Sequence, residues 1–367
     1  MDKSKVYFTD MRCPVGTSLL DKLDRLILEA EIDKINFDAK FTAIKIHFGE
    51  PGNLSFLRPN FAKTVADRIR ALGGKPFLTD CNTLYVGRRN NALVHLDAAY
   101  ENGYSPFSTG CQIIIGDGLK GTDEIDVPIN GSKYLKSAKI GRAIMDADII
   151  ISLSHFKGHE LTGFGGAIKN IGMGCGSRAG KMIMHSDGKP EVQKHKCTGC
   201  RVCVKFCDHN AIKFDDSKAE IDKESCAGCG RCIGSCNFNA ISNKDGSSNQ
   251  MLNFKMAEYC KAVLDGRTHF HISIINQVSP FCDCHGDNDA AVIPDIGMFA
   301  SFDPIALDKA CIDAANAAPA IETSILSECA KKSDHFTNIH PATNWREQIE
   351  YAQELGIGSA HYDLVTI

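Results

Sequence analysis

Residues 148–170 read DIIISLSHFKGHELTGFGGAIKN. The apolar run at 148–153 predicts a buried β-strand, and the polar, glycine-rich turn behind it leads into a segment that we expect to be helical. When a strand passes through such a turn into a helix, the turn lies at the carboxyl edge of the sheet, where open α/β folds bind their ligands. The stretch therefore predicts an α/β fold with a ligand site at that edge.

The same alternation of strand-like and helix-like segments extends outward on both sides of this stretch. We expect further strands at 6–8, 42–48, 76–79, 111–115 and 269–275, and helices at 17–32, 59–72, 90–102, 137–145, 304–315 and 344–355. Strands that alternate with helices favour a mostly parallel sheet flanked by helices on both faces. With 367 residues, the chain is long enough for such an α/β domain and an insertion within it.

The glycine-rich turn and the segment behind it carry four of the side chains that we expect to act at this site. Lys157 and Lys169 would attract a carboxylate or phosphate group, and His155 and His159 are candidates for acid–base groups or metal ligands. His47 follows another expected strand and is a fifth candidate. The alternative is a solvated loop whose glycines serve only tight packing, with His47 as a hydrogen-bonded structural residue.

Two nearly identical cysteine runs interrupt the α/β pattern. The first contains Cys197, Cys200, Cys203 and Cys207, and the second contains Cys226, Cys229, Cys232 and Cys236. Each has the CxxCxxCxxxC spacing of bacterial two-cluster ferredoxins, in which the fourth cysteine of one run binds the other cluster. We therefore expect two [4Fe–4S] clusters, one on Cys197, Cys200, Cys203 and Cys236 and the other on Cys226, Cys229, Cys232 and Cys207.

These runs predict a small α+β ferredoxin-like insertion at 189–246, between a first part of the α/β domain at 1–188 and a second part at 247–367. The stretch 245–248 is interpreted as the exit linker. Asp208 and Asn237 stand where ferredoxins of this kind carry proline, which removes no ligand. The alternative is a pair of zinc sites with four thiolates each, although zinc ribbons do not use this spacing twice.

A further cysteine pair lies outside the two runs. Cys282 and Cys284 are separated by one residue, and Pro280 favours an extended or turned backbone in which both thiolates face the same soft metal ion. We expect an additional metal or cluster at this pair, with buried free thiols as the alternative.

Charge and hydropathy exclude several classes of partner. The net charge of −4 gives no basic stripe for nucleic acid, and no apolar run approaches the roughly 18 residues that cross a bilayer. The amino terminus lacks the features of an export signal, so we expect a cytoplasmic protein. CxxC spacings suit metal clusters in a reducing compartment better than disulfides.

The chain resembles the DUF362 family, iron–sulfur proteins of anaerobic bacteria and archaea whose reaction is uncharacterised. The resemblance rests on both cysteine runs and on residues 46–50, 73–80, 82–85, 154–170, 282–284 and 294–297. It implies an α/β domain with a ferredoxin insert. Family members usually carry threonine at the position of Cys81, so no metal role is assigned to that cysteine.

Together these features predict an iron–sulfur redox protein whose two clusters pass electrons to or from a small anionic substrate on the α/β domain. If the protein is an enzyme, it is an iron–sulfur oxidoreductase. One alternative is an electron carrier that serves a redox partner protein and has no substrate of its own. Another is a redox-sensing or metal-trafficking module. A nicotinamide or flavin site is not indicated, because the glycines at 163–166 lack the GxGxxG spacing.

Overall fold

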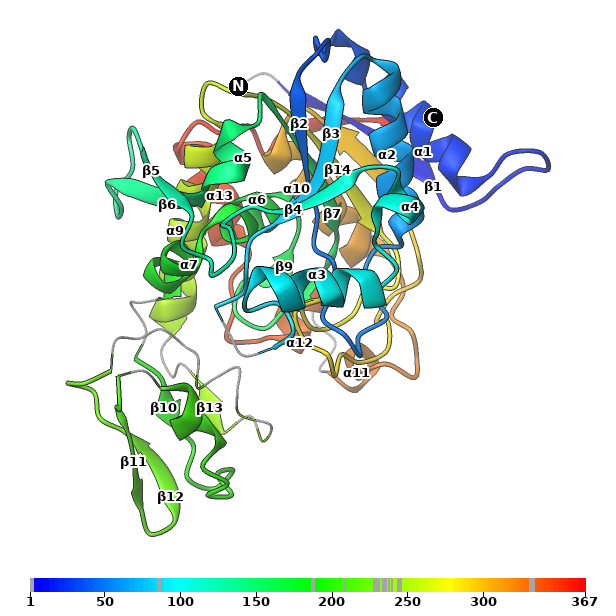
Figure 1. The fold of residues 1–367 in the computed structure, drawn as a ribbon. Coiled ribbons are helices and arrows are strands. Elements are labelled where there is room, and N and C mark those ends of the chain that lie inside the picture. The colour runs from blue at the N-terminus through cyan, green and yellow to red at the C-terminus, as the bar shows by residue number, and fades with distance from the viewer. Residues whose placement is uncertain are drawn as a thin grey trace.

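The centre of the molecule is an eight-stranded sheet (Figure 1). The computed structural model describes residues 3–84, 87–185, 189–207, 209–226, 232, 236, 238, 240–242, 246–329 and 334–367. The strands lie in the order β16 (Tyr362–Thr366), β1 (Ser4–Asp10), β15 (Gly297–Ser301), β14 (Thr268–Ile275), β7 (Ile149–His155), β2 (Phe41–Lys45), β3 (Lys75–Asp80) and β4 (Gln112–Ile115). Only β15 runs antiparallel to its neighbours, so the predicted mostly parallel sheet is confirmed.

Strand β7 explains why the run at 149–153 is mainly apolar. It lies between β14 and β2 and is buried along its whole length. Successive side chains of a strand point to opposite faces of the sheet, and here Ile150 enters one hydrophobic core while Ile151 and Leu153 enter the other. A strand that is covered on both faces needs apolar residues at every position, not at every second one.

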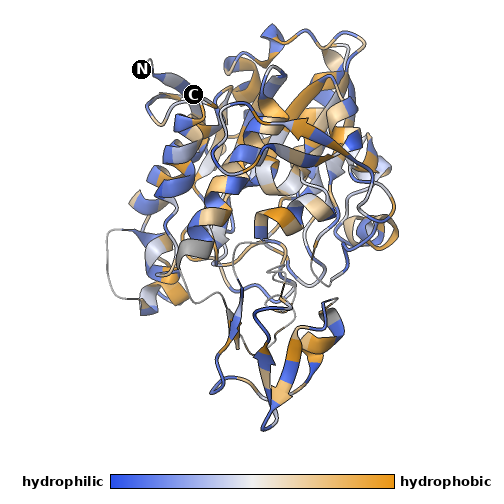
Figure 2. Cartoon of the chain, turned by 90° about the vertical axis from the view of Figure 1, so that its left-hand side faces the viewer, coloured by the Kyte–Doolittle hydropathy of each residue, from blue (hydrophilic) through white to orange (hydrophobic). Residues whose placement is uncertain are grey.

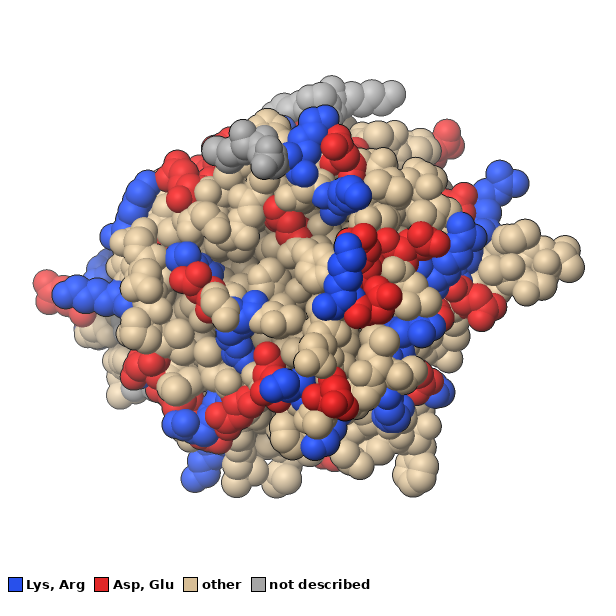
Figure 3. Space-filling view, turned by 90° about the horizontal axis from the view of Figure 1, so that it is seen from above, with Lys and Arg blue, Asp and Glu red and all other residues tan. Residues whose placement is uncertain are grey.

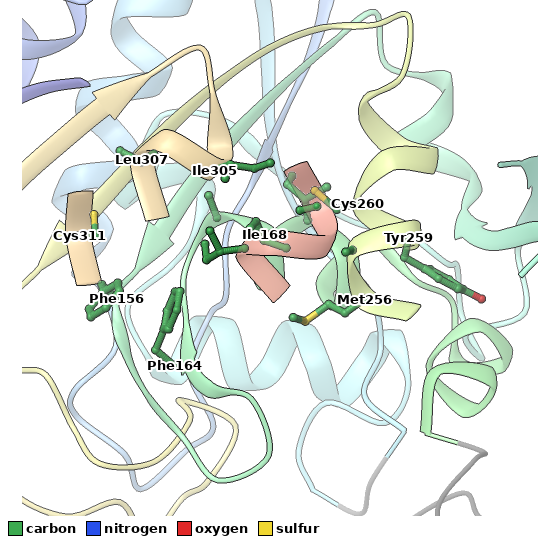
Figure 4. Packing of buried hydrophobic residues seen from close by; sticks show 14 of the residues in the cluster. Phe156, Phe164, Ile168, Met256, Tyr259, Cys260, Ile305, Leu307 and Cys311 are labelled. Atoms are coloured by element: carbon green, nitrogen blue, oxygen red, sulfur yellow. The ribbon is translucent and has the colours of Figure 1, made fainter. Parts of the chain in front are cut away.

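Helices cover both faces of the sheet. Helices α1 (Leu19–Glu29) and α2 (Pro59–Ala71) pack on one core through Leu23, Leu26 and Val65. Helices α6 (Ala167–Cys175), α9 (Gly246–Leu264), α10 (Pro304–Ala317) and α13 (Arg346–Glu354) form the other core, where Ile168, Met256 and Ile305 meet beside Phe156 and Phe164 (Figure 4).

Local signals fix several of the helix starts. The Ser18 side chain accepts a hydrogen bond from the Asp21 amide, and Asp21 bonds back to Ser18, which is a capping box. Helix α2 has Pro59 in its first turn. The remaining short helices are η1 (Ile32–Lys34), α3 (Ala92–Glu101), α4 (Pro106–Thr109), α11 (Ile325–Glu328) and α12 (His335–Ile339).

Three local predictions are wrong. Residues 137–145 were expected to be one helix, but β6 (Ser137–Gly141) pairs with β5 (Glu124–Pro128) and only α5 (Arg142–Asp146) is helical. Ala138 and Ile140 are buried at every second position, which is the period of a strand. The expected linker at 246–248 is the first turn of α9; position 245 lies outside the described residues. The expected strand at 42–48 ends at Lys45.

The cysteine-rich segment lies between α7 (Arg178–His185) and α9, below the central sheet (Figures 1 and 2). It contains the strand pairs β10 (Glu191–Val192) with β13 (Ile241–Ser242) and β11 (Ile212–Asp215) with β12 (Lys218–Ile221), and the short helix η2 (Val202–Phe206). Its own small core joins Ile212, Ile221 and Ile241 to Cys203 and Cys232. The segment therefore has apolar packing of its own beside the two cores of the sheet.

On the face of the molecule seen in Figure 3, acidic and basic side chains are intermixed, and neither kind forms a large patch. This mixture is the one that the small net charge leads us to expect. In the described part of the chain, we find no helix that combines the length and the apolar character needed to cross a membrane.

Candidate functional site

The carboxyl ends of β3, β2, β7 and β14 and the segments that follow them surround a partly open cavity. Five basic side chains line it: Lys45, Arg89, Lys157, Lys169 and Lys181. The lining also contains three histidines, two carboxylates and three thiols, which are His47, His159, His185, Asp80, Glu160, Cys81, Cys282 and Cys284. Parallel strands bring residues that are far apart in the sequence to one edge, as an α/β ligand site requires.

A buried ion pair joins the ends of two neighbouring strands at the cavity wall. Lys45 Nζ, at the end of β2, lies 3.0 Å from Asp80 Oδ1, at the end of β3, and both side chains are at most 3% exposed. Lys45 also donates to Asn170 Oδ1 at 2.9 Å. Burial alone would raise the pKa of the Asp80 carboxyl, but Lys45, His47 and His95 hold it well below its usual value. Asp80 is therefore a fixed negative charge that compensates the buried lysine.

Two of the three cavity histidines, His47 and His159, share a tautomer that their loops impose. The Gly49 amide donates to His47 Nδ1 at 3.0 Å, and the Leu161 amide donates to His159 Nδ1 at 3.1 Å. An imidazole that accepts at Nδ1 carries its hydrogen on Nε2 when it is neutral. Burial, with Arg89 nearby, lowers the pKa of His47 well below its usual value. His47 is thus a neutral imidazole that offers an Nε2–H donor.

Cys282 is held as a thiolate at the cavity. Lys169 Nζ lies 3.3 Å from Cys282 Sγ. The pKa of Cys282 falls well below that of a free thiol, mainly because the Cys284 thiol donates to it and, against the cost of burial, because Lys169 and His159 stabilise its negative charge. The interaction with Cys282, together with burial and the charge of Glu160, raises the pKa of Cys284, so the proton of the pair stays on Cys284.

Four of the five predicted acid–base and anion-binding residues line this cavity, namely His47, Lys157, His159 and Lys169. His155 lies behind them. Its Nδ1 is 2.9 Å from Asp283 Oδ1 and its Nε2 is 2.7 Å from the Asn276 carbonyl oxygen. Asp283 in turn lies 3.3 Å from Lys157 Nζ. His155 therefore orients the segment that carries Cys282 and Cys284, and both of its ring nitrogens are engaged in doing so.

The cavity is also lined by the two helices that flank the cysteine-rich segment in the sequence, α7 and α9. Lys181 and His185 come from α7, which leads into that segment, and Leu252 comes from α9, which leads out of it. Burial lowers the pKa of His185 to about 3, helped by His159 and Lys169. The walls of the cavity are thus connected directly to both ends of the segment.

Within the cysteine-rich segment, Cys197, Cys200, Cys203 and Cys236 line a second cavity, of about 310 Å³. The fourth of these comes from the second run, as the ferredoxin spacing predicts. The Ala219 amide lies 3.4 Å from Cys197 Sγ and the Ala240 amide 3.3 Å from Cys236 Sγ. Such N–H donors stabilise thiolates, so these four residues fit an iron–sulfur cluster.

The second predicted ligand set is described only in part. Cys207, Cys226 and Cys232 all belong to the core of the segment, and the Ala211 amide donates to Cys207 Sγ at 3.3 Å. Cys229 and the two residues in place of proline, Asp208 and Asn237, lie outside the described residues. Among the residues that the structure does describe, no three His, Cys, Asp or Glu side chains form a site for a single metal ion.

Helix α6, which carries Lys169 and Asn170 to the cavity, begins at a buried carboxylate. Asp308 accepts from the Ala167 amide at 2.6 Å and the Ile168 amide at 2.9 Å. A Cβ atom at Gly166 would lie 2.2 Å from Asp308 Oδ1, so only glycine fits there. Burial raises the pKa of Asp308 to about 7 despite these hydrogen bonds.

Asp308→Asn is expected to become more stable relative to the native protein as the pH rises. A carboxyl whose folded-state pKa is raised stabilises the fold at low pH and loses that contribution between the unfolded pKa and the folded one. For Asp308 that window runs from 3.8 to about 7. Urea denaturation of both proteins at about pH 5 and pH 8 should show a relative gain of up to about 3 kcal/mol. An equal difference at both pH values would contradict the prediction.

A comparison with family models identifies the family of this chain. The family model described as "Domain of unknown function (DUF362)" matches residues 42–313. The chain belongs to this family. The matched range of this DUF362 protein includes the cavity residues from Lys45 to Cys284 and the whole cysteine-rich segment.

More distant similarities cover parts of other proteins. A thylakoid-associated protein of Synechocystis sp. (strain ATCC 27184 / PCC 6803 / Kazusa) is 28% identical over 125 residues, which cover 34% of this chain and 35% of that protein. The lactate racemase apoprotein of Thermoanaerobacterium thermosaccharolyticum has 12% identity and a TM-score of 0.35, with 74% of this chain and 51% of that chain covered. A Thermotoga maritima protein has 11% identity and a TM-score of 0.37, with 92% and 58% covered.

Several site residues were not anticipated from the sequence. Lys45 stood within an expected strand and was assigned no role. Asp80 lies in the segment 79–85, which closes the next expected strand and whose polar groups were expected to line the same crevice, with capping of the following helix as the alternative. Arg89 and Lys181 lie in stretches that carry no motif. For Lys45 and Asp80 the sequence did offer a signal, because each is a charged residue at the end of a buried parallel strand. Lys and Asp are seldom buried unless they are paired. The others depend on how α7 and the segment before α3 pack.

Proposed function

We propose that this DUF362 protein is an iron–sulfur oxidoreductase in which two [4Fe–4S] clusters exchange electrons with a small anionic substrate in the cavity at the carboxyl edge of the sheet. The observation that carries the proposal is the position of this cavity, whose walls include α7 and α9 on either side of the cysteine-rich segment. When bound, clusters of this kind supply single electrons at a potential that the protein environment sets.

The cysteine geometry supports the clusters. One ligand set, Cys197, Cys200, Cys203 and Cys236, lines a common cavity and receives backbone N–H donors at two of its sulfurs. A zinc ion takes its four ligands at about 2.0 to 2.3 Å, so zinc thiolates must converge closely. A cubane cluster is itself several ångströms wide and holds its thiolates further apart, and the CxxCxxCxxxC spacing of both runs favours the cluster.

The large cavity favours an anionic ligand. Five cationic side chains line it against two carboxylates and the Cys282 thiolate. Glu50 and Asp283, which pair with Arg89 and Lys157, are not part of the lining. Lys181 Nζ donates to the Gly176 carbonyl oxygen at 2.6 Å. Cations in a partly enclosed site raise the local concentration of anions. Lys181 and Lys169 would bind the anionic group of the substrate, while the neutral His47 holds a proton on Nε2 toward the same space.

Glu160 adds a second requirement on the ligand. Its Oε1 lies 3.0 Å from His285 Nε2. Its other oxygen, Oε2, is buried and has no hydrogen-bond partner among the described residues. Buried carboxylate oxygens are normally paired. A ligand that carries a hydrogen-bond donor beside its anionic group would satisfy this oxygen.

Electrons would enter from a redox partner protein at the outer face of the cysteine-rich segment. Cys200 is exposed there, and the apolar side chains Val204 and Phe238 are 40% and 47% exposed. Phe238 also lines the cavity of the four cysteines. An exposed apolar surface next to a cluster suits a transient electron-transfer contact. If the protein were only an electron carrier, this surface would have the same role, but the basic cavity would have none.

Reoxidation of the reduced protein tests the proposal. Protein purified without oxygen is reduced with dithionite and mixed with small carboxylate- or phosphate-bearing oxidants, and the visible absorbance of the clusters is followed. At least one oxidant should restore the absorbance, and Lys181→Met should slow that reaction by about tenfold, the effect of losing one favourable contact of about 1.4 kcal/mol. Stoichiometric zinc without iron would overturn the proposal.

The matched control is Lys133→Met, which removes an exposed lysine that does not line the cavity. Lys133 pairs with Glu354 at the surface, and both side chains are 59% exposed. Reoxidation rates in this variant should equal those of the native protein. Equal slowing in both lysine variants would show that general electrostatics, and not the cavity, governs the reaction, and would count against the proposal.

A further inference from the structure

Cys282 and Cys284 lie in one tight turn and line the same cavity. The His285 amide donates to the Cys282 carbonyl oxygen at 3.1 Å, which closes the turn, and both side chains reach the large cavity. Residues two apart are at most about 7 Å apart at Cα, and a turn shortens this span. Disulfides accept Cα separations of about 4.4 to 6.8 Å. Both side chains line the same cavity from this turn, so the two sulfurs lie on the same side of it.

The surroundings give the two sulfurs different roles. The Lys169 ammonium lies 3.3 Å from Cys282 Sγ and favours the thiolate there, which is the attacking form of cysteine. Cys284 lies two residues away in the same turn and lines the same cavity, which is the position of a resolving cysteine. A soft metal cation at Cys282 would have to displace the Lys169 ammonium at 3.3 Å. The contacts therefore favour sulfur redox chemistry over the additional metal that the CxC spacing suggested.

We propose that Cys282 and Cys284 form a redox-active dithiol–disulfide couple whose substrate is a small anionic molecule containing a disulfide bond, R–S–S–R. The Cys282 thiolate attacks one substrate sulfur, which forms a Cys282–S–S–R bond and breaks the R–S–S–R bond. The departing thiolate takes the Cys284 proton. Cys284 then attacks Cys282 Sγ, forms the Cys282–Cys284 disulfide and releases the second thiolate. The substrate gains two electrons and the protein loses two.

Regeneration of the couple requires two electrons and one proton, which restore the Cys282 thiolate and the Cys284 thiol. This step, and only this step, rests on the proposed function, because the two electrons come one at a time from the two iron–sulfur clusters. Lys169 stabilises the thiolate product through the 3.3 Å contact. The basic cavity lining explains why the substrate should be an anion.

Two disulfides of similar size and opposite charge test the couple. Thiol-reduced protein, kept free of oxygen, is treated with 3,3′-dithiodipropionate, a dicarboxylate, or with cystamine, a diamine. Alkylation followed by peptide mass spectrometry then locates each oxidised cysteine. The dicarboxylate should produce a Cys282–Cys284 disulfide at least about tenfold faster than the diamine does, a modest effect for a charged site. Lys169→Met should remove most of that preference.

Variants of the pair separate the two roles. In Cys284→Ala the reaction should stop at a mixed disulfide between Cys282 and one mercaptopropionate, whereas Cys282→Ser should leave Cys284 unmodified. Three results would overturn the couple: adducts on Cys284 alone in the native protein, equal rates with both disulfides, or a tightly bound metal that protects both thiols until a chelator removes it. Exposed Cys13 serves as the internal reference, since it should react with both reagents.

The readout also separates this inference from the proposed function. The disulfide is scored by mass on the protein itself and needs no turnover. If the couple forms but dithionite-reduced clusters fail to reopen it in the iron-loaded protein, the electron route of the proposed function fails while the couple stands. If anionic oxidants reoxidise the clusters but Cys282 and Cys284 stay as thiols throughout, the couple fails and the oxidoreductase stands.

Discussion

Cys203→Ala and Cys236→Ala are expected to lose the same iron–sulfur cluster, although they belong to different cysteine runs. Both residues line one cavity with Cys197 and Cys200. In a two-cluster ferredoxin arrangement, the native protein should hold about eight iron atoms, and each variant about four. The double variant should also hold about four, because its second substitution removes a ligand from a cluster that is already lost.

Iron and sulfide analysis with low-temperature EPR of the reduced proteins measures this outcome. Two reduced clusters in one chain give a spin-coupled signal, and each single variant should show the simpler signal of one cluster. Cys203→Ala/Cys232→Ala should lose nearly all iron, because its two substitutions fall on different predicted ligand sets. If each run bound its own cluster, Cys203→Ala/Cys236→Ala would instead lose all iron. Cys13→Ala, which changes an exposed cysteine outside both runs, is the control.

Asp80→Asn is expected to lower the free energy of unfolding by about 3 to 5 kcal/mol, the cost of removing one partner from a buried ion pair. Asp80 lies 3.0 Å from Lys45 and 3.8 Å from Arg89, all three side chains being at most 4% exposed. The amide would leave Lys45 as an uncompensated buried charge. Urea denaturation at neutral pH, followed by far-ultraviolet circular dichroism, measures the change.

A double-mutant cycle separates the ion pair from other effects of the substitution. Lys45→Met alone should also destabilise the protein, and Lys45→Met/Asp80→Asn should lose less than the sum of the two single variants, because neither charge remains. Glu354→Gln breaks an exposed pair with Lys133 and should change stability little. Strict additivity in the cycle would show that Asp80 and Lys45 do not stabilise each other.

The sequence was most informative where one physical requirement governs a whole segment. Residues 148–153 could be assigned to a buried strand because burial on both faces favours a nearly continuous apolar run, and β7 confirms this over Ile149–His155. The turn behind it placed Lys157, His159 and Lys169 at one site, since the carboxyl ends of parallel strands share one edge. The spacing of the cysteine runs predicts that Cys236 shares a cluster with Cys197, Cys200 and Cys203, and these four residues line one cavity. The cluster itself stays a prediction.

The sequence was least informative where tertiary packing determines the outcome. His155 has the same local pattern as His159, and only the approach of Asp283 and the Asn276 carbonyl shows that it supports the site from behind. Residues 137–141 carry mixed helix and strand signals, and pairing with β5 selects the strand. The relation of Lys169 to Cys282 joins residues 113 apart in the sequence, which no spacing rule can predict.

The position of β14 constrains the order in which the protein matures. This strand and the turn with Cys282 and Cys284 follow the cysteine-rich segment in the chain, yet β14 pairs directly with β7, which precedes it. Synthesis proceeds from the amino terminus, so the segment emerges from the ribosome while the substrate cavity still lacks one wall. Insertion of the proposed clusters could therefore precede completion of the sheet, because the described core of the cysteine-rich segment contains no residue of β14.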